Sequence, residues 1–209
     1  MKKIVYGLFF GDSITYGEYD GVFGGWVDIL KRYALQKFHE GNGDELILFN
    51  LGIGGENTEG LLKRMPHELS ARNSVDGNLV FISYGANDLA VKEGKQVVEP
   101  EQFKNNIQTA VQLARQFSND IYLVSILPIS QTIDGVMVSS GKLRTNEEVG
   151  VYNQIIKNIA ADNALGYIDF HTAFIEDKEI LLSADGVHPN EKGYGMMAEI
   201  AIPIIEKYL

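Results

Sequence analysis

Five short runs of nearly uninterrupted apolar residues constrain the fold of this chain more than any other feature of its sequence. The runs cover residues 4–10, 46–50, 79–84, 121–127 and 167–170. Apolar and polar residues do not alternate within them, so both faces of each predicted strand should be covered by other parts of the protein. This pattern is typical of a parallel sheet that lies between two layers of helices.

Segments with apolar residues at helical spacing lie between the five runs. Their stripes are Trp26, Ile29, Leu30 and Tyr33; Leu61, Leu62, Met65 and Leu69; Phe103, Ile107, Ala110, Val111, Ala114 and Phe117; and Tyr152, Ile155, Ile156 and Ile159. A last helix is expected from about Asn190 into Ala201, and Pro203 should kink or end it. The alternation of strands and helices predicts an α/β protein with an open, doubly wound parallel sheet. We expect residues 1–209 to form a single domain.

The composition excludes several kinds of site and partner. The absence of Cys removes disulfides, Fe–S clusters, Cys-based zinc sites and thiol nucleophiles. The formal net charge of −10 argues against nucleic acid and anionic membrane surfaces as main partners. Lys2 and Lys3 precede an apolar run that is too short for a signal peptide, and no segment approaches the roughly 20 apolar residues that cross a bilayer. We therefore expect a cytoplasmic protein without stable membrane insertion.

Glycines and polar residues follow the predicted strands at four places. These are residues 11–15 after the first strand, 50–55 after the second, 85–88 after the third, and 185–189 before the last helix. In an open α/β sheet the ligand crevice lies beyond the carboxyl ends of the strands. All four segments should therefore meet at one rim of the sheet.

The residue types in these segments match the needs of acyl transfer, which requires a nucleophile, a base, a group that orients the base, and donors for an oxyanion. Ser13 follows a strand and is the candidate nucleophile. His188 is the candidate base, and Asp185 precedes it by three residues, close enough in one turn to hold the imidazole. The candidate oxyanion donors are the backbone amides of Ser13 and Gly55 and the side-chain amide of Asn87.

These motifs resemble those of the SGNH (GDSL-type) hydrolases. The resemblance rests on GDSIT around Ser13, on residues 50–55, on GAND at 85–88 and on DGVHP at 185–189, in the family's order and across nearly the whole chain. The spelling GDSI in place of GDSL leaves the serine unchanged. The choice of Gly55 within a glycine doublet rests on its five-residue spacing from Asn50.

The resemblance implies a flavodoxin-like three-layer α/β/α sandwich with a five-stranded parallel sheet, and no metal or other cofactor. It also implies a carboxylic ester hydrolase with Ser13 as nucleophile, Gly55 and Asn87 as oxyanion donors, and His188 as base. Sugar esters, lipids, small acyl esters and thioesters are all substrates of this kind of enzyme. We expect a small-molecule ester with a short acyl chain, because the sites of the family are generally open and shallow.

Two other functions fit parts of the sequence. One is a metal-dependent phosphoesterase that uses Asp12, Asn87, Asp88 and His188, although such sites usually need several clustered His ligands. The other is a non-catalytic flavodoxin-like binding module, which the lack of a phosphate-binding glycine loop after the first strand disfavours. An α/β-hydrolase is excluded because no G-x-S-x-G motif occurs.

Structural interpretations compete with several of the functional ones. Asp185 could cap the last helix, and Asn87 could close a turn. Asp169 and His171 form a second Asp–His pair, but on an extended chain their side chains would not face each other. His39 and His67 are predicted to be surface residues, Trp26 a core residue, and Asp12 a structural hydrogen-bonder near the serine.

The pocket walls are expected to come from residues 15–24, 88–94 and 128–144. The third of these segments is the least regular part of the sequence. It could cover the site as a loop or form a variable surface connection.

Overall fold

A computed structural model describes residues 2–41 and 43–209, and it contains the five predicted strands in one parallel sheet. The strands are β1 (Ile4–Gly11), β2 (Glu45–Gly52), β3 (Asn78–Ser83), β6 (Asp120–Val124) and β7 (Gly166–Ile168). Their spatial order is β2-β1-β3-β6-β7, and every neighbouring pair is parallel. This is the flavodoxin-like strand order, so the predicted fold class is confirmed.

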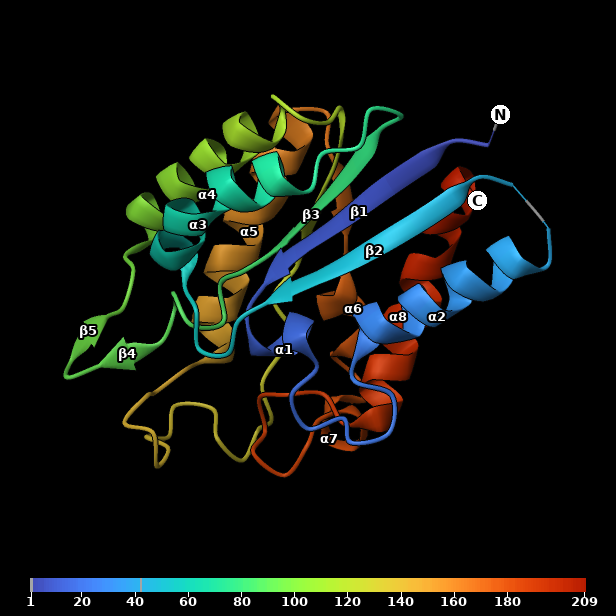
Figure 1. The fold of residues 1–209 in the computed structure, drawn as a ribbon. Coiled ribbons are helices and arrows are strands. Elements are labelled where there is room, and N and C mark those ends of the chain that lie inside the picture. The colour runs from blue at the N-terminus through green and yellow to red at the C-terminus, as the bar shows by residue number, and fades with distance from the viewer. Residues whose placement is uncertain (1, 42) are drawn as a thin grey trace.

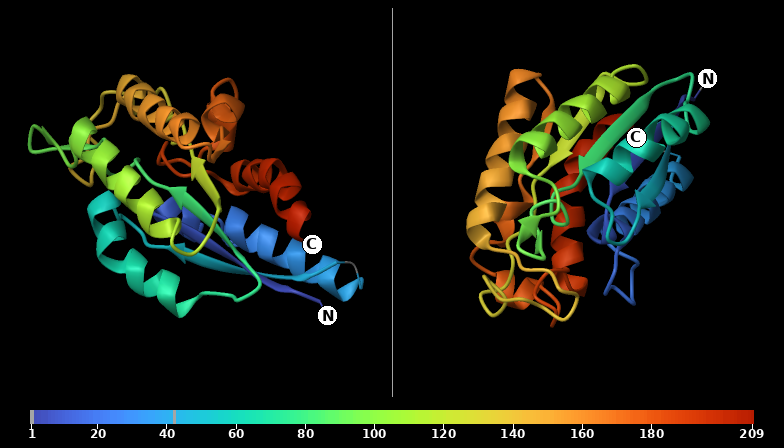
Figure 2. Two further views of the ribbon diagram at one scale, coloured as in Figure 1. Left: turned by 90° about the horizontal axis from the view of Figure 1, so that it is seen from above. Right: turned by 90° about the vertical axis from the view of Figure 1, so that its left-hand side faces the viewer.

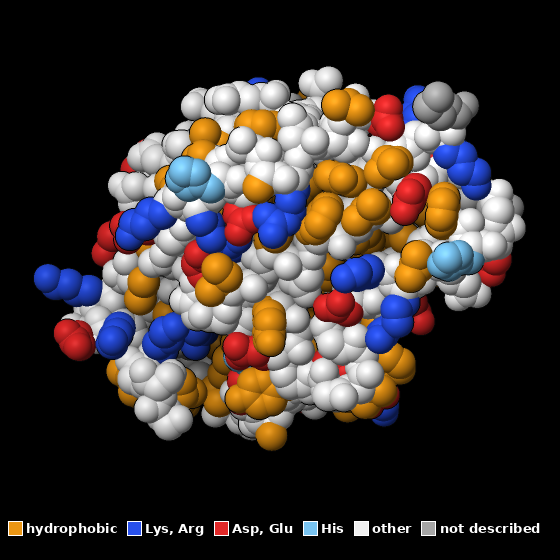
Figure 3. Space-filling view, viewed as in Figure 1, with side chains coloured by type: hydrophobic (Ala, Val, Ile, Leu, Met, Phe, Trp, Pro, Cys, Tyr) orange, Lys and Arg blue, Asp and Glu red, His pale blue; other side chains and the backbone are white. Residues whose placement is uncertain are grey.

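Helices cover both faces of the sheet and complete a three-layer α/β/α sandwich (Figures 1 and 2). One face carries α3 (Thr58–Ala71), α4 (Pro100–Ala114) and α5 (Asn146–Asp162). The other carries α2 (Trp26–His39), α6 (Phe170–Phe174), α7 (Lys178–Leu181) and α8 (Glu191–Ile205). The four-residue helix α1 (Ser13–Tyr16) follows the end of β1 directly. On the face seen in Figure 3, charged side chains of both signs are interspersed over the outer surface.

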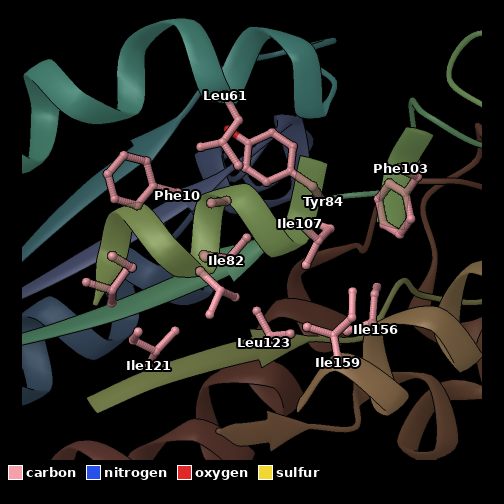
Figure 4. Packing of buried hydrophobic residues seen from close by; sticks show 14 of the residues in the cluster. Phe10, Leu61, Ile82, Tyr84, Phe103, Ile107, Ile121, Leu123, Ile156 and Ile159 are labelled. Atoms are coloured by element: carbon pink, nitrogen blue, oxygen red, sulfur yellow. The ribbon is translucent and has the colours of Figure 1, made fainter. Parts of the chain in front are cut away.

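Two apolar clusters, one on each face of the sheet, explain why the strands are apolar at nearly every position. Phe10 packs toward α3, α4 and α5 in the cluster that Figure 4 shows. Its neighbour Phe9 points to the opposite face, where its ring stacks on Phe81 at a centroid distance of 4.1 Å. Trp26 meets the Phe9 ring edge-on at 5.3 Å and is fully buried, which confirms its predicted place in the core. Successive residues of a strand therefore enter different cores.

Some element boundaries differ from the predictions. Helix α8 does not end at Pro203 but continues to Ile205, whose side chain is fully buried, and a 3₁₀ turn follows at Glu206–Tyr208. Proline in the last turn removes only one backbone hydrogen bond, and burial of the apolar residues beyond it keeps the turn helical. Strand β6 is shorter than expected because the chain leaves the sheet after Val124.

The short hairpin of β4 (Val91–Lys92) and β5 (Lys95–Gln96) was not predicted from the sequence. It projects beyond the carboxyl ends of the sheet strands, on the side where the loop of residues 128–144 runs (Figure 1). Within the residues that the structure describes, no helix is both long and apolar enough to cross a membrane.

Candidate active site

Ser13 is the first residue of α1 and lies immediately beyond the end of β1. Asp12 caps this helix, because its Oδ1 accepts a hydrogen bond from the Ile14 backbone amide at 2.9 Å. Gly11 leaves room for the tight turn, since a Cβ at that position would lie 1.9 Å from Thr15 Oγ1. The turn leaves Ser13 only 7% exposed, at the wall of a cavity. As predicted, Asp12 is a structural hydrogen-bonder next to the serine.

The imidazole of His188 lies between Ser13 and Asp185. His188 Nε2 is 2.7 Å from Ser13 Oγ, and His188 Nδ1 is 2.5 Å from Asp185 Oδ2. The other carboxylate oxygen of Asp185 accepts the backbone amides of Val187 and His188, both at 3.1 Å. With Nδ1 donating to the carboxylate, Nε2 is left as the acceptor that faces the serine hydroxyl.

The carboxylate of Asp185 is held in its charged form. Burial alone would raise its pKa, but the hydrogen bonds from the His188 ring and from the backbone amides of Val187 and His188 outweigh burial. The pKa of Asp185 therefore lies below its ordinary value of 3.8. An ionised partner fixes the orientation of the imidazole and favours its protonated form when a proton arrives.

Gly55 and Asn87, which the sequence predicted as oxyanion donors, line the same cavity as Ser13, Asp185 and His188. Gly55 has a φ of +76°, a left-handed conformation that favours glycine. Asn87 is buried, and its Nδ2 donates to the Glu56 carbonyl at 3.1 Å. The cavity has a volume of about 300 Å³. The structure thus brings all five predicted residues to one place.

A partly buried ion pair between Glu56 and Arg64 holds the turn that carries Gly55. The carboxylate of Glu56 accepts hydrogen bonds from Arg64 Nη2 at 2.8 Å and from the Tyr84 hydroxyl at 2.6 Å. Arg64 also donates to the Leu51 carbonyl at 2.6 Å, at the end of β2. Because Glu56 in turn accepts the Asn87 amide through its backbone, this network connects the glycine turn to Asn87.

Two residues of the loop after α1 border the imidazole, and the sequence singled out neither of them. The Tyr19 ring stacks on His188 at a centroid distance of 4.9 Å, with 24° between the planes. Tyr19 has a φ of +71°, which is uncommon for a residue with a bulky side chain. Glu18 Oε2 lies 3.6 Å from His188 Nε2. Both residues fall within the predicted wall segment 15–24.

The loop of residues 128–144 covers the other side of the cavity. Its last part, from Val138 to Arg144, lines the site together with Asn87. It is fixed to the β4–β5 hairpin, because Val91 and Leu143 exchange backbone hydrogen bonds of 2.8 and 2.9 Å. Residues 88–94 therefore support this wall but do not line the cavity, and their predicted role as a wall was wrong.

Two cations from this loop contact Asn87. Lys142 Nζ donates to Asn87 Oδ1 at 2.8 Å, and Arg144 Nη2 approaches the same oxygen at 3.4 Å. Arg144 Nε also donates to the Ala86 carbonyl at 2.7 Å. Burial lowers the pKa of both Lys142 and Arg144. No pattern in the sequence indicated this pair, because the contact joins residues more than fifty positions apart.

The remaining histidines lie elsewhere. Asp169 caps the short helix α6 through the Thr172 amide, so the chain there is not extended as expected. His171 lines a separate, open cavity and takes no part in the Ser13 site. His39 and His67 are exposed, as predicted. Among the residues that the structure describes, no three acidic, His or Cys side chains are grouped as a metal site would require.

Asp88 is fully buried beside the site and accepts hydrogen bonds from the Thr58 amide at 2.9 Å and the Thr58 hydroxyl at 2.5 Å. Burial raises its pKa from 3.8 to about 6. A carboxyl with a raised pKa binds its proton more tightly in the folded state than in the unfolded chain. Its contribution to stability therefore falls as the pH rises between these two values.

We expect Asp88→Asn to remove this dependence, because asparagine keeps an acceptor for Thr58 and has no charge. Relative to the variant, the free energy of unfolding of the unmodified protein should fall by about 1–3 kcal/mol between pH 4 and pH 7. Urea unfolding across that pH range measures the difference. Asp162→Asn, at an exposed position, is the control. If the free energy of unfolding changes with pH in the same way for the unmodified protein and Asp88→Asn, the raised pKa of Asp88 is contradicted.

Comparison with known proteins agrees with the fold and the site. The sequence profile of the GDSL-like Lipase/Acylhydrolase family matches residues 9–196. A GDSL esterase/lipase of Arabidopsis thaliana is 27% identical over 205 residues, which cover 91% of this chain and 81% of that protein. The isoamyl acetate-hydrolyzing esterase of Saccharomyces cerevisiae is 25% identical over 213 residues, covering 96% and 86%. The crystal structure of a lipase/acylhydrolase from Enterococcus faecalis has a TM-score of 0.73 at 25% identity, covering 99% of this chain and 96% of that one.

An open α/β sandwich with a serine, a histidine and an aspartate hydrogen-bonded in series at its strand ends has the features of a serine-type hydrolase. The chain belongs to the GDSL-like lipase/acylhydrolase family. It is a carboxylic ester hydrolase, as the resemblance of its four motifs implied.

Proposed function

We propose that this protein cleaves short-chain acyl esters of small molecules through an acyl-enzyme formed on Ser13. The observation that carries the proposal is the pair of hydrogen bonds made by His188, at 2.7 Å to Ser13 and at 2.5 Å to Asp185. In this assignment Ser13 is the nucleophile, His188 the base and Asp185 the group that orients the base.

In the first half of the reaction, Ser13 Oγ bonds to the ester carbonyl carbon while its proton passes to His188 Nε2. The carbonyl oxygen becomes an oxyanion, which accepts hydrogen bonds from the amides of Ser13 and Gly55 and from Asn87 Nδ2. The carbon–oxygen bond to the alcohol then breaks, and the alcohol leaves with the proton from Nε2. In the second half of the reaction, water attacks the acyl carbon while His188 takes its proton, and cleavage of the bond to Ser13 releases the acid and restores the serine hydroxyl.

The size and the lining of the cavity favour a short acyl chain. Its volume of about 300 Å³ is at the lower end of ordinary small-molecule sites. About half of its wall is polar or charged, including Glu18, Ser139, Ser140, Lys142 and Arg144. A cavity of this size offers little apolar surface to a long hydrocarbon chain, which contributes binding energy in proportion to the apolar area that it buries. The yeast relative is named for an acetyl ester.

A series of 4-nitrophenyl esters from acetyl to palmitoyl tests the chain-length preference. We expect kcat/KM to be highest for acetyl to butyryl and to fall at least about tenfold by lauryl, because the longer chain remains in water. Assays with and without EDTA serve as the control for a metal-dependent reaction. A maximum at lauryl or palmitoyl would contradict the short-chain assignment.

A further inference from the structure

The wall of the cavity beside Asn87 carries two cations, Lys142 and Arg144. Neither forms an ion pair with any Asp or Glu among the described residues. Arg144 is only 8% exposed, and Lys142 is half-buried. Within the described chain, the hydrogen bonds of the two side chains go to neutral oxygens, those of Asn87 and Ala86.

Cations buried to this extent normally have an anionic partner, because removal of a charge from water has a high free-energy cost. Two neighbouring cations also repel each other, and this repulsion adds to the effect of burial on Lys142, while the carboxyl of Asp12 acts in the opposite direction without forming an ion pair with either cation. A ligand with a negative charge would relieve both effects. The position of the pair at the wall of the cavity makes it accessible to a ligand in the site.

The pair lies next to the place where the ester reacts. Lys142 Nζ donates to Oδ1 of the same Asn87 amide group whose Nδ2 we assign to the oxyanion. A charged substituent within a few atoms of the ester carbonyl would therefore reach the ammonium group. The hydroxyls of Ser139 and Ser140, which also line the cavity, are further donors that an anion could use.

The charges of the cavity lie next to different members of the site. Glu18 and Asp185 lie beside the imidazole of His188, and Lys142 and Arg144 lie beside Asn87, although the charge of Asp185 also acts on Arg144. An anionic substituent is therefore repelled from the His188 side and attracted to the Asn87 side. Lys and Arg side chains also gather around the β4–β5 hairpin at this end of the molecule (Figure 3), although the chain as a whole carries a net charge of −10.

We propose that the preferred substrates are short-chain esters that carry an anionic group close to the ester carbonyl, bound by Lys142 and Arg144. This proposal rests on the proposed esterase function. The anionic group can belong to the acyl part or to the alcohol part of the ester, and the two sources require separate substrates.

Two matched pairs of substrates distinguish these sources. Monoethyl succinate and ethyl levulinate differ by a carboxylate in the acyl part, and release of ethanol measures their hydrolysis. The acetyl esters 4-acetoxybenzoate and 4-acetoxybenzamide differ by a carboxylate in the alcohol part, and release of the phenol measures theirs. In at least one pair we expect kcat/KM to be about ten- to a hundredfold higher for the anion, the usual effect of a hydrogen bond to a charged group. The pair that shows the preference identifies the part of the ester that carries the charge.

Lys142→Gln tests whether the cation is responsible, because glutamine keeps an amide donor and removes the charge. The ratio of kcat/KM for the anionic ester to that for its neutral partner should fall by about tenfold or more. If Lys142 only orients Asn87, both esters should lose activity by the same factor and the ratio should stay constant. Lys95→Gln, on the exposed hairpin, is the matched control and should leave the ratio unchanged.

The ratio of kcat/KM for the anionic ester to that for its neutral partner can be measured in the unmodified protein, so it tests the proposal even if Lys142→Gln does not fold. A ratio of one or less in both pairs would overturn the anionic specificity, as would equal losses for the two esters in Lys142→Gln. If the anionic specificity is overturned but the neutral esters are hydrolysed, the proposed short-chain esterase function still stands. If none of the four esters is hydrolysed, the proposed short-chain esterase function itself fails.

Discussion

Ser13→Ala is expected to lower kcat/KM for a short-chain 4-nitrophenyl ester by about 10⁴- to 10⁶-fold. The substitution removes the atom that would carry the acyl group, together with the hydrogen bond to His188 Nε2. Any residual rate would come from the oxyanion donors and from substrate binding, which do not depend on the hydroxyl. Hydrolysis at saturating and at low substrate concentration measures kcat and kcat/KM separately.

Ser70→Ala, at an exposed position of α3, is the control for Ser13→Ala and should keep full activity. Mass spectrometry after treatment with a 4-nitrophenyl alkylphosphonate gives a second readout. One phosphonyl group should attach to the unmodified protein and to Ser70→Ala, but none to Ser13→Ala. If Ser13→Ala keeps more than about a tenth of the activity, Ser13 is not the nucleophile.

His188→Ala should cause a loss of similar size, about 10⁴- to 10⁶-fold, because the serine then has no group to take its proton. The two residues act as a unit, so the double variant with Ser13→Ala should be hardly less active than either single variant. Multiplicative losses in the double variant would indicate that Ser13 and His188 act independently.

The pH dependence of the unmodified enzyme tests the same assignment without a substitution. Only the neutral imidazole can accept the serine proton, so kcat/KM should fall as the pH is lowered. Asp185 stays ionised as the pH falls toward 4, because its pKa lies below its ordinary value. The buried carboxyl of Asp12, whose pKa is raised to about 6 chiefly by burial, also gains a proton as the pH falls, so the acidic limb includes more than one protonation. A rate that stays constant down to pH 4 would contradict His188 as the base.

The sequence predicted the strands and the site residues because both depend on local patterns. Apolar residues at successive positions such as Phe9 and Phe10 indicate a strand that is covered on both faces, whatever its partners are. Since the carboxyl ends of parallel strands share one edge, residues after different strands could be expected to meet. The structure brings Ser13, Asn87 and His188 together on this basis.

Element boundaries and the cavity wall were less predictable because they depend on contacts between distant segments. Pro203 lies inside α8, where buried apolar neighbours outweigh the lost hydrogen bond. Asp169 caps a helix in a segment that was expected to be extended. The contacts of Lys142 and Arg144 with Asn87 depend on the course of the loop of residues 128–144, which pairs with Val91 of β4 through Leu143.

The sequence by itself therefore determined the layered α/β fold, the family and the residues to which we assign acyl transfer, because hydrophobic periodicity and short motifs are local properties of a chain. Only the tertiary structure decided what surrounds these residues. Tyr19 stacks on His188 and Lys142 binds Asn87 across long distances in the sequence. The depth and charge of a pocket depend on contacts between loops that are distant in the sequence, and local sequence patterns do not predict such contacts.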